Sequence, residues 1–168
     1  MKKIAFLILG LLILSGCGLY TDIEGQIEQT TPKITLKSSP STKRKPSRTD
    51  FKWNGLVASA EHPAPQDFLN YQTIVQVKHP EKIQIAVQKK VKLGIMESAY
   101  LSDMVLTMIP ESGEDVTEIS LKELESGVWQ FQVPSKPGKY MYILKEFYGV
   151  GLEIGYYVTY YFGLEVTN

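Results

Sequence analysis

The amino-acid sequence predicts an all-β sandwich of seven to eight strands in the C-terminal two-thirds of the chain. From residue 51 onward, apolar and polar residues alternate in short runs, which is the period-two pattern of strands that bury one face. Glycine and proline separate these runs, and no long segment has the 3.6-residue period of a helix. Many short strands joined by such turns are typical of a sandwich or a barrel.

The alternating runs define the expected strands in chain order: 51–59, 73–78, 82–88, 104–109, 116–121, 128–133, 140–147 and 156–166. Ser120 and Glu123 match a capping box, which would open one short turn of helix before Gly127. The even-numbered residues from 156 to 166 are all apolar or aromatic, so they are expected to face the core. Trp129 is expected to be buried with Phe131 on the inward face of its strand.

A short motif refines the type of sandwich. Residues 137–142 read Pro-Gly-Lys-Tyr-Met-Tyr, which resembles the tyrosine corner of immunoglobulin-like domains. The resemblance implies an immunoglobulin-like sandwich in which the hydroxyl of Tyr140 returns to the backbone a few residues upstream. Tyr142 stands where antibody domains carry their second cysteine, so the usual disulfide between the sheets is not expected.

The first 17 residues have the pattern of an export signal. Two lysines precede an apolar run of 11 residues, 4–14, which is shorter than the roughly 20 residues that span a membrane. The run ends in Leu14-Ser15-Gly16-Cys17, which resembles the lipobox of bacterial lipoproteins and implies that Cys17 is lipidated and begins the mature protein. Residues 129–142 are also similar to the C-terminal parts of small uncharacterised lipoproteins of Gram-positive bacteria. For the N-terminal segment, the alternatives to a lipoprotein signal are an ordinary secretory signal with a chance cysteine and a short buried helix.

The sequence therefore divides into a signal peptide (1–16), a lipidated tether (17–50) and the sandwich (51–168). The tether is rich in Ser, Thr, Pro and Lys, so it is expected to be disordered and to reach roughly 30 Å as a coil. Its later part carries six basic residues with no acidic residue between them: Lys33, Lys37, Lys43, Arg44, Lys45 and Arg48. This run is expected either to be a solvated linker or to contact anionic phospholipid or an anionic wall polymer.

Several functional classes are not expected. Cys17 is the chain's only cysteine, and the two histidines, His62 and His79, lack the spacing of metal ligands. No nucleophile elbow or phosphate-binding loop is present in the sequence. We therefore predict no catalytic residue, no cofactor and no metal. Nucleic acid is not an expected partner, because the chain is exported and its basic run has no interleaved aromatic residues.

The aromatic residues suggest a binding surface. Seven of the ten tyrosines follow residue 139. Tyr157 and Tyr161 lie opposite the predicted core face of the last strand, and Tyr148 lies close before it. These three tyrosines are predicted to form an exposed patch that binds a sugar or a protein. The alternative is aromatic pairing between neighbouring strands.

Together these features predict a lipoprotein of the cell membrane, anchored on the extracytoplasmic side. Its domain is expected to be a non-enzymatic binding or interaction module whose partner is a protein or an anionic wall polymer. One alternative is an exported hydrolase or another small-molecule-processing domain, which requires a cleft with converging acidic, basic or nucleophilic side chains. Another alternative is a structural accessory subunit of a membrane complex.

Overall fold

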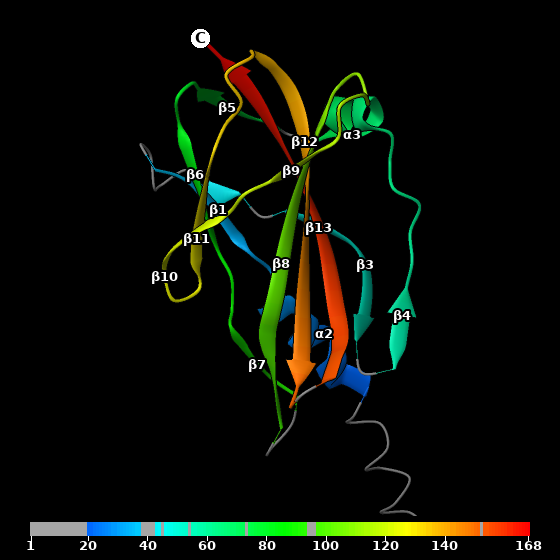
Figure 1. Ribbon diagram of the computed structural model, residues 1–168. Helices are drawn as coiled ribbons and strands as arrows, with labels where there is room; N and C mark the ends of the chain where they lie inside the picture. Colours follow the sequence, from blue (N-terminus) through cyan, green and yellow to red (C-terminus); the bar gives the residue numbers. More distant parts are fainter. Residues whose placement is uncertain are drawn as a thin grey trace, which may run out of the picture.

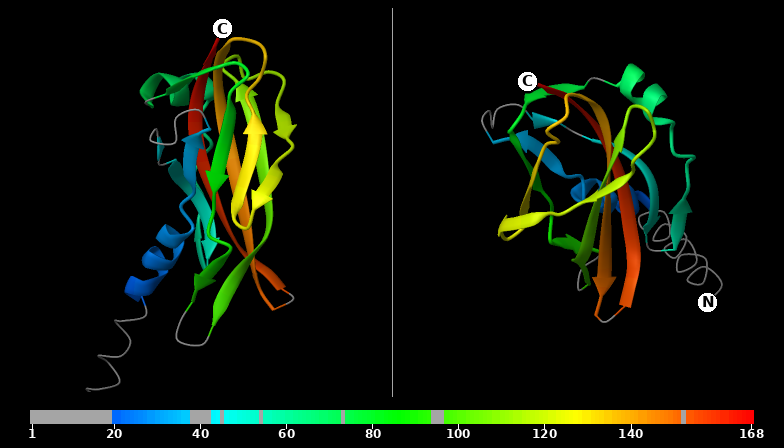
Figure 2. Two further views of the ribbon diagram at one scale, coloured as in Figure 1. Left: turned by 90° about the vertical axis from the view of Figure 1, so that its left-hand side faces the viewer. Right: turned by 45° about the horizontal axis from the view of Figure 1, so that its top comes forward.

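The computed structural model describes residues 20–37, 43–44, 46–53, 55–72, 74–93, 97–151 and 153–168. In this part of the chain, two β-sheets pack against each other, with one helix at one end and a second helix on an outer face (Figures 1 and 2). The predicted all-β sandwich is confirmed. Cys17 and the predicted signal peptide lie outside the described residues.

The smaller sheet has five strands in the order β10-β11-β6-β1-β2, and all its neighbours are antiparallel. Alternation in its central strand is as predicted, because Ile83 and Ile85 of β6 are fully buried. The bounds of the five strands are Lys122–Glu125 (β10), Val128–Gln132 (β11), Lys82–Ala86 (β6), Lys33–Leu36 (β1) and Lys43–Arg44 (β2).

The larger sheet has eight strands, and a long hairpin of β12 and β13 forms its centre. The order is β4-β3-β13-β12-β8-β7, while β5 runs parallel to the end of β13 and β9 pairs with β8. The bounds are Leu56–Ala58 (β4), Ser47–Trp53 (β3), Glu153–Thr167 (β13), Gly138–Val150 (β12), Ser98–Pro110 (β8), Lys90–Lys92 (β7), Val75–Lys78 (β5) and Thr117–Ile119 (β9).

Aromatic residues fill the space between the sheets. The rings of Tyr142 and Phe162 stack with centroids 5.0 Å apart, and Phe131 of the smaller sheet lies 5.2 Å from Tyr142. The even-numbered residues from 158 to 166 are at most 2% exposed. The predicted core face of the last strand is therefore confirmed from 158 to 166, while Tyr156 is half-buried against the core.

The predicted tyrosine corner is also present. The hydroxyl of Tyr140 donates a hydrogen bond of 2.7 Å to the carbonyl oxygen of Lys136. Gly138 has a φ of +149° and lies under the Tyr140 ring, where an added Cβ would be 3.8 Å from the ring. The hydrogen bond between Tyr140 and Lys136 closes the turn that leads into β12.

Three details of the predicted fold are wrong. The described residues form thirteen strands and not seven to eight, because the predicted strand 51–59 is split into β3 and β4, the N-terminal segment adds β1 and β2, and β7 and β10 were not predicted. Residues 122–125, predicted to be helical, form β10, which is paired with β11 through a turn at Gly127. Helix α3 (Pro65–Tyr71) was not predicted; it begins with a proline in its first turn, where no backbone N–H is needed.

The predicted tether from 17 to 50 is wrong for residues 20–37, 43–44 and 46–50. Helix α2 (Tyr20–Gln29), strands β1 and β2 and the first residues of β3 lie in this range. Ile23 and Ile27, four residues apart on one face of α2, are 9% and 0% exposed, and Ile34 of β1 is 3% exposed. These residues are part of the sandwich core, so the folded domain already includes residue 20.

Candidate functional site

Helix α3 covers Tyr161, one of the three tyrosines predicted to form an exposed surface. Tyr161 is 1% exposed, and its ring lies 5.9 Å from the ring of Phe68 of this helix. Leu69 and Met141 complete a second, smaller core on this outer face of the larger sheet. Gly163 fits beneath the helix, since an added Cβ would lie 3.0 Å from Leu69. The prediction that Tyr161 is exposed to a partner is wrong, because a helix distant in sequence packs on it.

Tyr148 and Tyr157 are not part of an exposed aromatic patch either. Tyr148 is fully buried between the sheets. Tyr157 is half-buried and pairs with Phe147 of the neighbouring strand, and the Lys145 ammonium lies 4.4 Å from the centre of its ring. The alternative expectation, aromatic pairing between neighbouring strands, describes this part of the sheet.

A buried polar cluster lies beneath α2, inside the sandwich. Glu146 of β12 is fully buried, and one of its carboxyl oxygens lies 3.0 Å from the hydroxyl of Tyr148. The same hydroxyl lies 3.0 Å from the carbonyl oxygen of Gln88. The other Glu146 oxygen has no hydrogen-bond partner in the described part of the chain. A charged carboxylate is costly in such a place.

The pKa values in this cluster are shifted toward the neutral forms. Burial raises the pKa of Glu146 well above its ordinary value, and the hydrogen bond with Tyr148 offsets only part of this rise. Burial, and then the nearby Glu146, raise the pKa of Tyr160 to about 12. A protonated Glu146 can donate to the Tyr148 oxygen, whose own hydrogen then goes to Gln88. The cluster is thus a chain of neutral hydrogen bonds closed to solvent.

We expect Glu146→Gln to change how stability depends on pH. The folded-state pKa lies above the ordinary 4.5, so the native protein holds a proton that the unfolded chain releases. The stability from this group is complete below the unfolded-state pKa and falls as pH rises through the folded-state pKa, by about 1.4 kcal/mol per pH unit at most. The glutamine variant should lack this loss and gain stability relative to the original protein between about pH 5 and 8.

The measurement is urea unfolding of both proteins across that pH range. Glu165→Gln is the matched control, because this carboxylate is partly exposed and bonds to Gln76 on the surface. If Glu146→Gln were destabilising at every pH and by a constant amount, the buried carboxyl would not be protonated in the native state.

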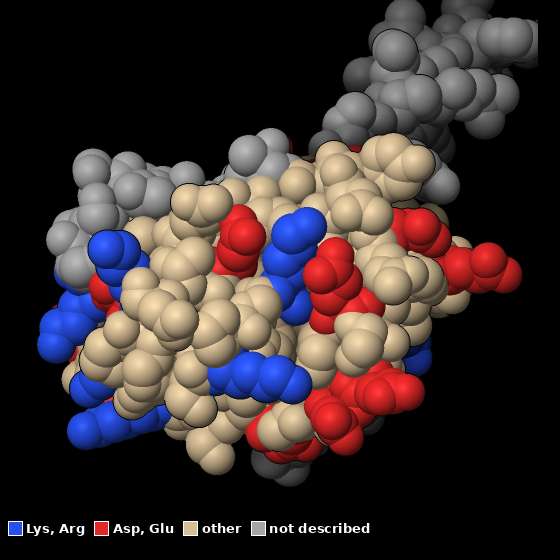
Figure 3. Space-filling model, turned by 90° about the horizontal axis from the view of Figure 1, so that it is seen from above, with Lys and Arg blue, Asp and Glu red and all other residues tan. Residues whose placement is uncertain are grey.

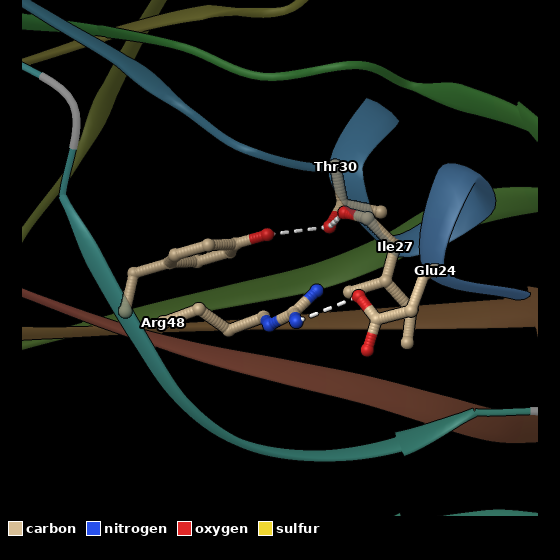
Figure 4. Close-up of polar contacts among 5 residues, drawn as sticks. Glu24, Ile27, Thr30 and Arg48 are labelled. Atoms are coloured by element: carbon tan, nitrogen blue, oxygen red, sulfur yellow. Dashed lines mark hydrogen bonds and ion pairs between the residues drawn. The ribbon is translucent and has the colours of Figure 1, made fainter.

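Hydrogen bonds and an ion pair attach helix α2 to three different segments of the sandwich. The Trp53 indole N–H donates to Gln26 Oε1 at 3.1 Å, and Gln26 Nε2 donates to the carbonyl oxygen of Leu93 at 2.9 Å. The Arg48 guanidinium lies 2.8 Å from the Glu24 carboxylate. Figure 4 shows this pair, with Thr30 at the end of the helix. The Thr30 hydroxyl lies 2.6 Å from the hydroxyl of Tyr160 in the larger sheet and donates to Ile27.

Arg48 belongs to the basic run that was predicted to be a solvated linker or to contact anionic phospholipid or an anionic wall polymer. Its pairing with Glu24 gives this residue an intramolecular role. The acid precedes the whole basic run in sequence, so a linear charge pattern could not show the pairing.

A groove of about 620 Å³ lies beside the C-terminal end of α2. Its walls are the helix end and the start of β1, the end of β6 and the β10–β11 turn. At its base, Val87 N–H donates to the Gly127 carbonyl at 2.8 Å, and a Cβ at Gly127 would lie 2.9 Å from the Val87 oxygen. The close approach of these backbones requires glycine at this position.

A second groove lies at the opposite end of the sandwich and is basic. It has a volume of about 510 Å³ and is lined by Lys37, Lys78, His79, Pro80, Glu81 and Lys82. Backbone bonds fix its walls: Lys37 N–H donates to the Lys82 carbonyl, and His79 N–H donates to the carbonyl of Thr167, both at 3.0 Å. Figure 3 shows this end of the molecule, where Lys and Arg gather toward one side and acidic residues toward the other.

The two histidines lie apart. Both are exposed, as predicted. His79 lines the basic groove, while His62 contacts the edge of the Tyr161 ring and hydrogen-bonds to its hydroxyl through Nδ1. Within the described ranges, no three His, Cys, Asp or Glu side chains come together as a possible metal site.

Comparison with protein-family models, curated proteins and solved structures finds no match to this chain. Among the helices that the structure describes, none has the length and hydropathy needed to cross a membrane.

Proposed function

We propose that this protein is a lipoprotein, anchored through Cys17 to the extracytoplasmic side of the cell membrane, whose sandwich is a non-enzymatic binding module. The observation that carries the anchor is Leu14-Ser15-Gly16-Cys17 after a short apolar run. Lipidation with two acyl chains gives stable membrane attachment, whereas a single chain binds only marginally.

The basic groove supports the binding role. Lys37, Lys78 and Lys82 come from segments that backbone hydrogen bonds hold together, so their ammonium groups surround one open groove. A groove with cationic walls attracts an anionic ligand and raises its local concentration. An anionic wall polymer is the partner that best fits this charge on an exported protein. The buried Glu146 cluster does not favour the hydrolase alternative, because its carboxyl is fully buried and closed to substrate.

We expect Cys17→Ser to abolish labelling of the protein by a fatty-acid analogue and to release it from the membrane fraction. The hydroxyl of serine cannot form the thioether that would carry the lipid. Ser15→Ala is the control, because it leaves the cysteine and the small-residue pattern before it. Labelling that persists in Cys17→Ser would show that Cys17 is not the lipidated residue.

We expect Lys78→Ser combined with Lys82→Ser to weaken binding to isolated, protein-free cell walls. Both lysines are exposed, so the domain should remain as stable as the original, while the groove loses two of its three ammonium groups. Cosedimentation with walls at low and high salt measures the effect, since salt screens such contacts. Lys122→Ser with Lys136→Ser changes the net charge equally outside the groove. Equal binding by both double variants would contradict a ligand site in this groove.

A further inference from the structure

The folded domain begins very close to the predicted anchor. Helix α2 starts at Tyr20, three residues after Cys17. Consecutive Cα atoms are about 3.8 Å apart, so the Cα atoms of these two residues are at most about 11 Å apart, whatever path the chain takes. A disordered tether of the predicted length would have allowed roughly 30 Å. If Cys17 carries lipid, the start of α2 must therefore lie at the bilayer surface.

Helix α2 cannot swing out to provide a longer tether without breaking the core. Ile27 is fully buried, and Gln26, itself 2% exposed, bonds to both Trp53 and Leu93. The bond between Thr30 and Tyr160 fixes the other end of the helix. Helix α2, and with it the start of the described chain, is thus held at one end of the sandwich.

The elements around α2 define the end that would meet the membrane. In Figures 1 and 2, this end contains β7, the start of β8 and the tip of the β12–β13 hairpin. Lys90 and Lys92 of β7 are exposed, and Tyr100 is 52% exposed with the Lys90 ammonium 5.5 Å from its ring centre. Tyrosine and lysine both suit a headgroup region, because each joins an apolar body to a polar tip.

We propose that the α2 end of the sandwich, with the tip of the long β12–β13 hairpin, rests on the phospholipid headgroups and that the two strands extend from this tip away from the bilayer. This inference rests on the proposed lipidation of Cys17. Strand β13 has 15 residues and ends beside the basic groove, so it holds that groove roughly 45 Å from the membrane-facing end, at about 3.3 Å per residue. The basic groove then faces the cell wall and not the lipid.

The experiment places one fluorophore at either end of the molecule. Because Cys17 is the only cysteine and its sulfur would carry the lipid, an introduced cysteine offers a single free thiol. Lys92→Cys, paired with the start of β8, marks the membrane-facing end, and Glu114→Cys, after the end of β8, marks the far end. Both positions are exposed. The full-length proteins are purified from membranes, labelled and reconstituted into phosphatidylglycerol–phosphatidylethanolamine vesicles that carry a headgroup quencher.

We expect loss of fluorescence at Lys92→Cys and none at Glu114→Cys, in proteins that float with the vesicles. Inserting 15 glycine and serine residues between Gly18 and Leu19 should keep the protein on the vesicles but restore the fluorescence of the Lys92→Cys label. Floating protein with equal quenching at both positions, or with none at either, would overturn the orientation and leave lipidation intact. Protein that does not float would overturn the proposed anchor and the orientation with it.

Discussion

A fragment that begins at residue 51 is expected to remain unfolded, whereas a fragment that begins at residue 20 should fold. The shorter fragment lacks α2, β1, β2 and the first four residues of β3. Strand β1 lies between β6 and β2 in the smaller sheet and pairs with β6 from Lys33 to Leu36. Its removal exposes one edge of β6, together with the core beneath α2.

The expected loss is as large as the stability of a whole domain. Ile23, Ile27 and Ile34 are all at least nine-tenths buried, and burying one such side chain contributes about 1.5–3 kcal/mol. Their sum, about 5–9 kcal/mol, is comparable with the 5–15 kcal/mol of a typical domain. The shorter fragment also loses the hydrogen bond that the Trp53 indole donates to Gln26 and the one that Gln26 donates to the Leu93 carbonyl.

Circular dichroism and thermal unfolding of the two fragments, both made without lipid, provide the test. The 20–168 fragment should show strand signal and one cooperative transition. The 51–168 fragment should show neither. A cooperative transition in 51–168 would mean that the N-terminal segment is an accessory to the sandwich and not a part of its core.

The alternation of apolar residues was sufficient to predict the central strands. One face of β12 and of β13 is buried along most of its length, so the period-two pattern of apolar residues repeats along each strand. The Tyr140 corner was likewise visible, because the glycine and the tyrosine that form it are two residues apart. Sequence patterns thus predicted the features that depend on residues close together in the chain.

The N-terminal elements were missed because their signal is sparse. Among residues 23–29 of α2, Ile23 and Ile27 are the buried apolar side chains, and the Ser, Thr, Pro and Lys that follow dominate the composition of the segment. Most of the helix's attachment is polar, through partners such as Trp53 and Arg48 that lie more than 20 residues away. Spacing within the segment does not encode such contacts.

The prediction of an exposed tyrosine surface was wrong for a related reason. Strand alternation distinguishes two faces, but it does not show whether a second layer covers the outer one. Phe68 and Leu69 lie between prolines and polar residues, without a long helical period, and yet they cover Tyr161. Three consecutive buried residues, Val158, Thr159 and Tyr160, show that this strand is covered on both faces.

Trp53→Ala is expected to destabilise the domain by about 3–5 kcal/mol, as for a large aromatic side chain removed from a core. Trp53 is fully buried, and its ring centroid lies 5.4 Å from that of Tyr148 and 5.1 Å from that of Tyr156. Its loss would also remove the hydrogen bond that the indole donates to the side-chain oxygen of Gln26, which is 2% exposed. The sequence had indicated the other tryptophan, Trp129, as the buried one.

Trp129→Ala is the matched comparison and should cost less, about 1–2 kcal/mol. Trp129 is half-buried at the edge of the core, where the Lys89 ammonium lies 5.4 Å from its ring centre. Trp53→Phe keeps an aromatic ring but removes the N–H together with part of the buried ring system, so its cost should include about 1 kcal/mol from the lost bond and stay below that of Trp53→Ala. Urea unfolding followed by circular dichroism measures all three variants with the same probe. If Trp129→Ala were as destabilising as Trp53→Ala, the packing of α2 on Trp53 would not be the main contribution of tryptophan to this fold.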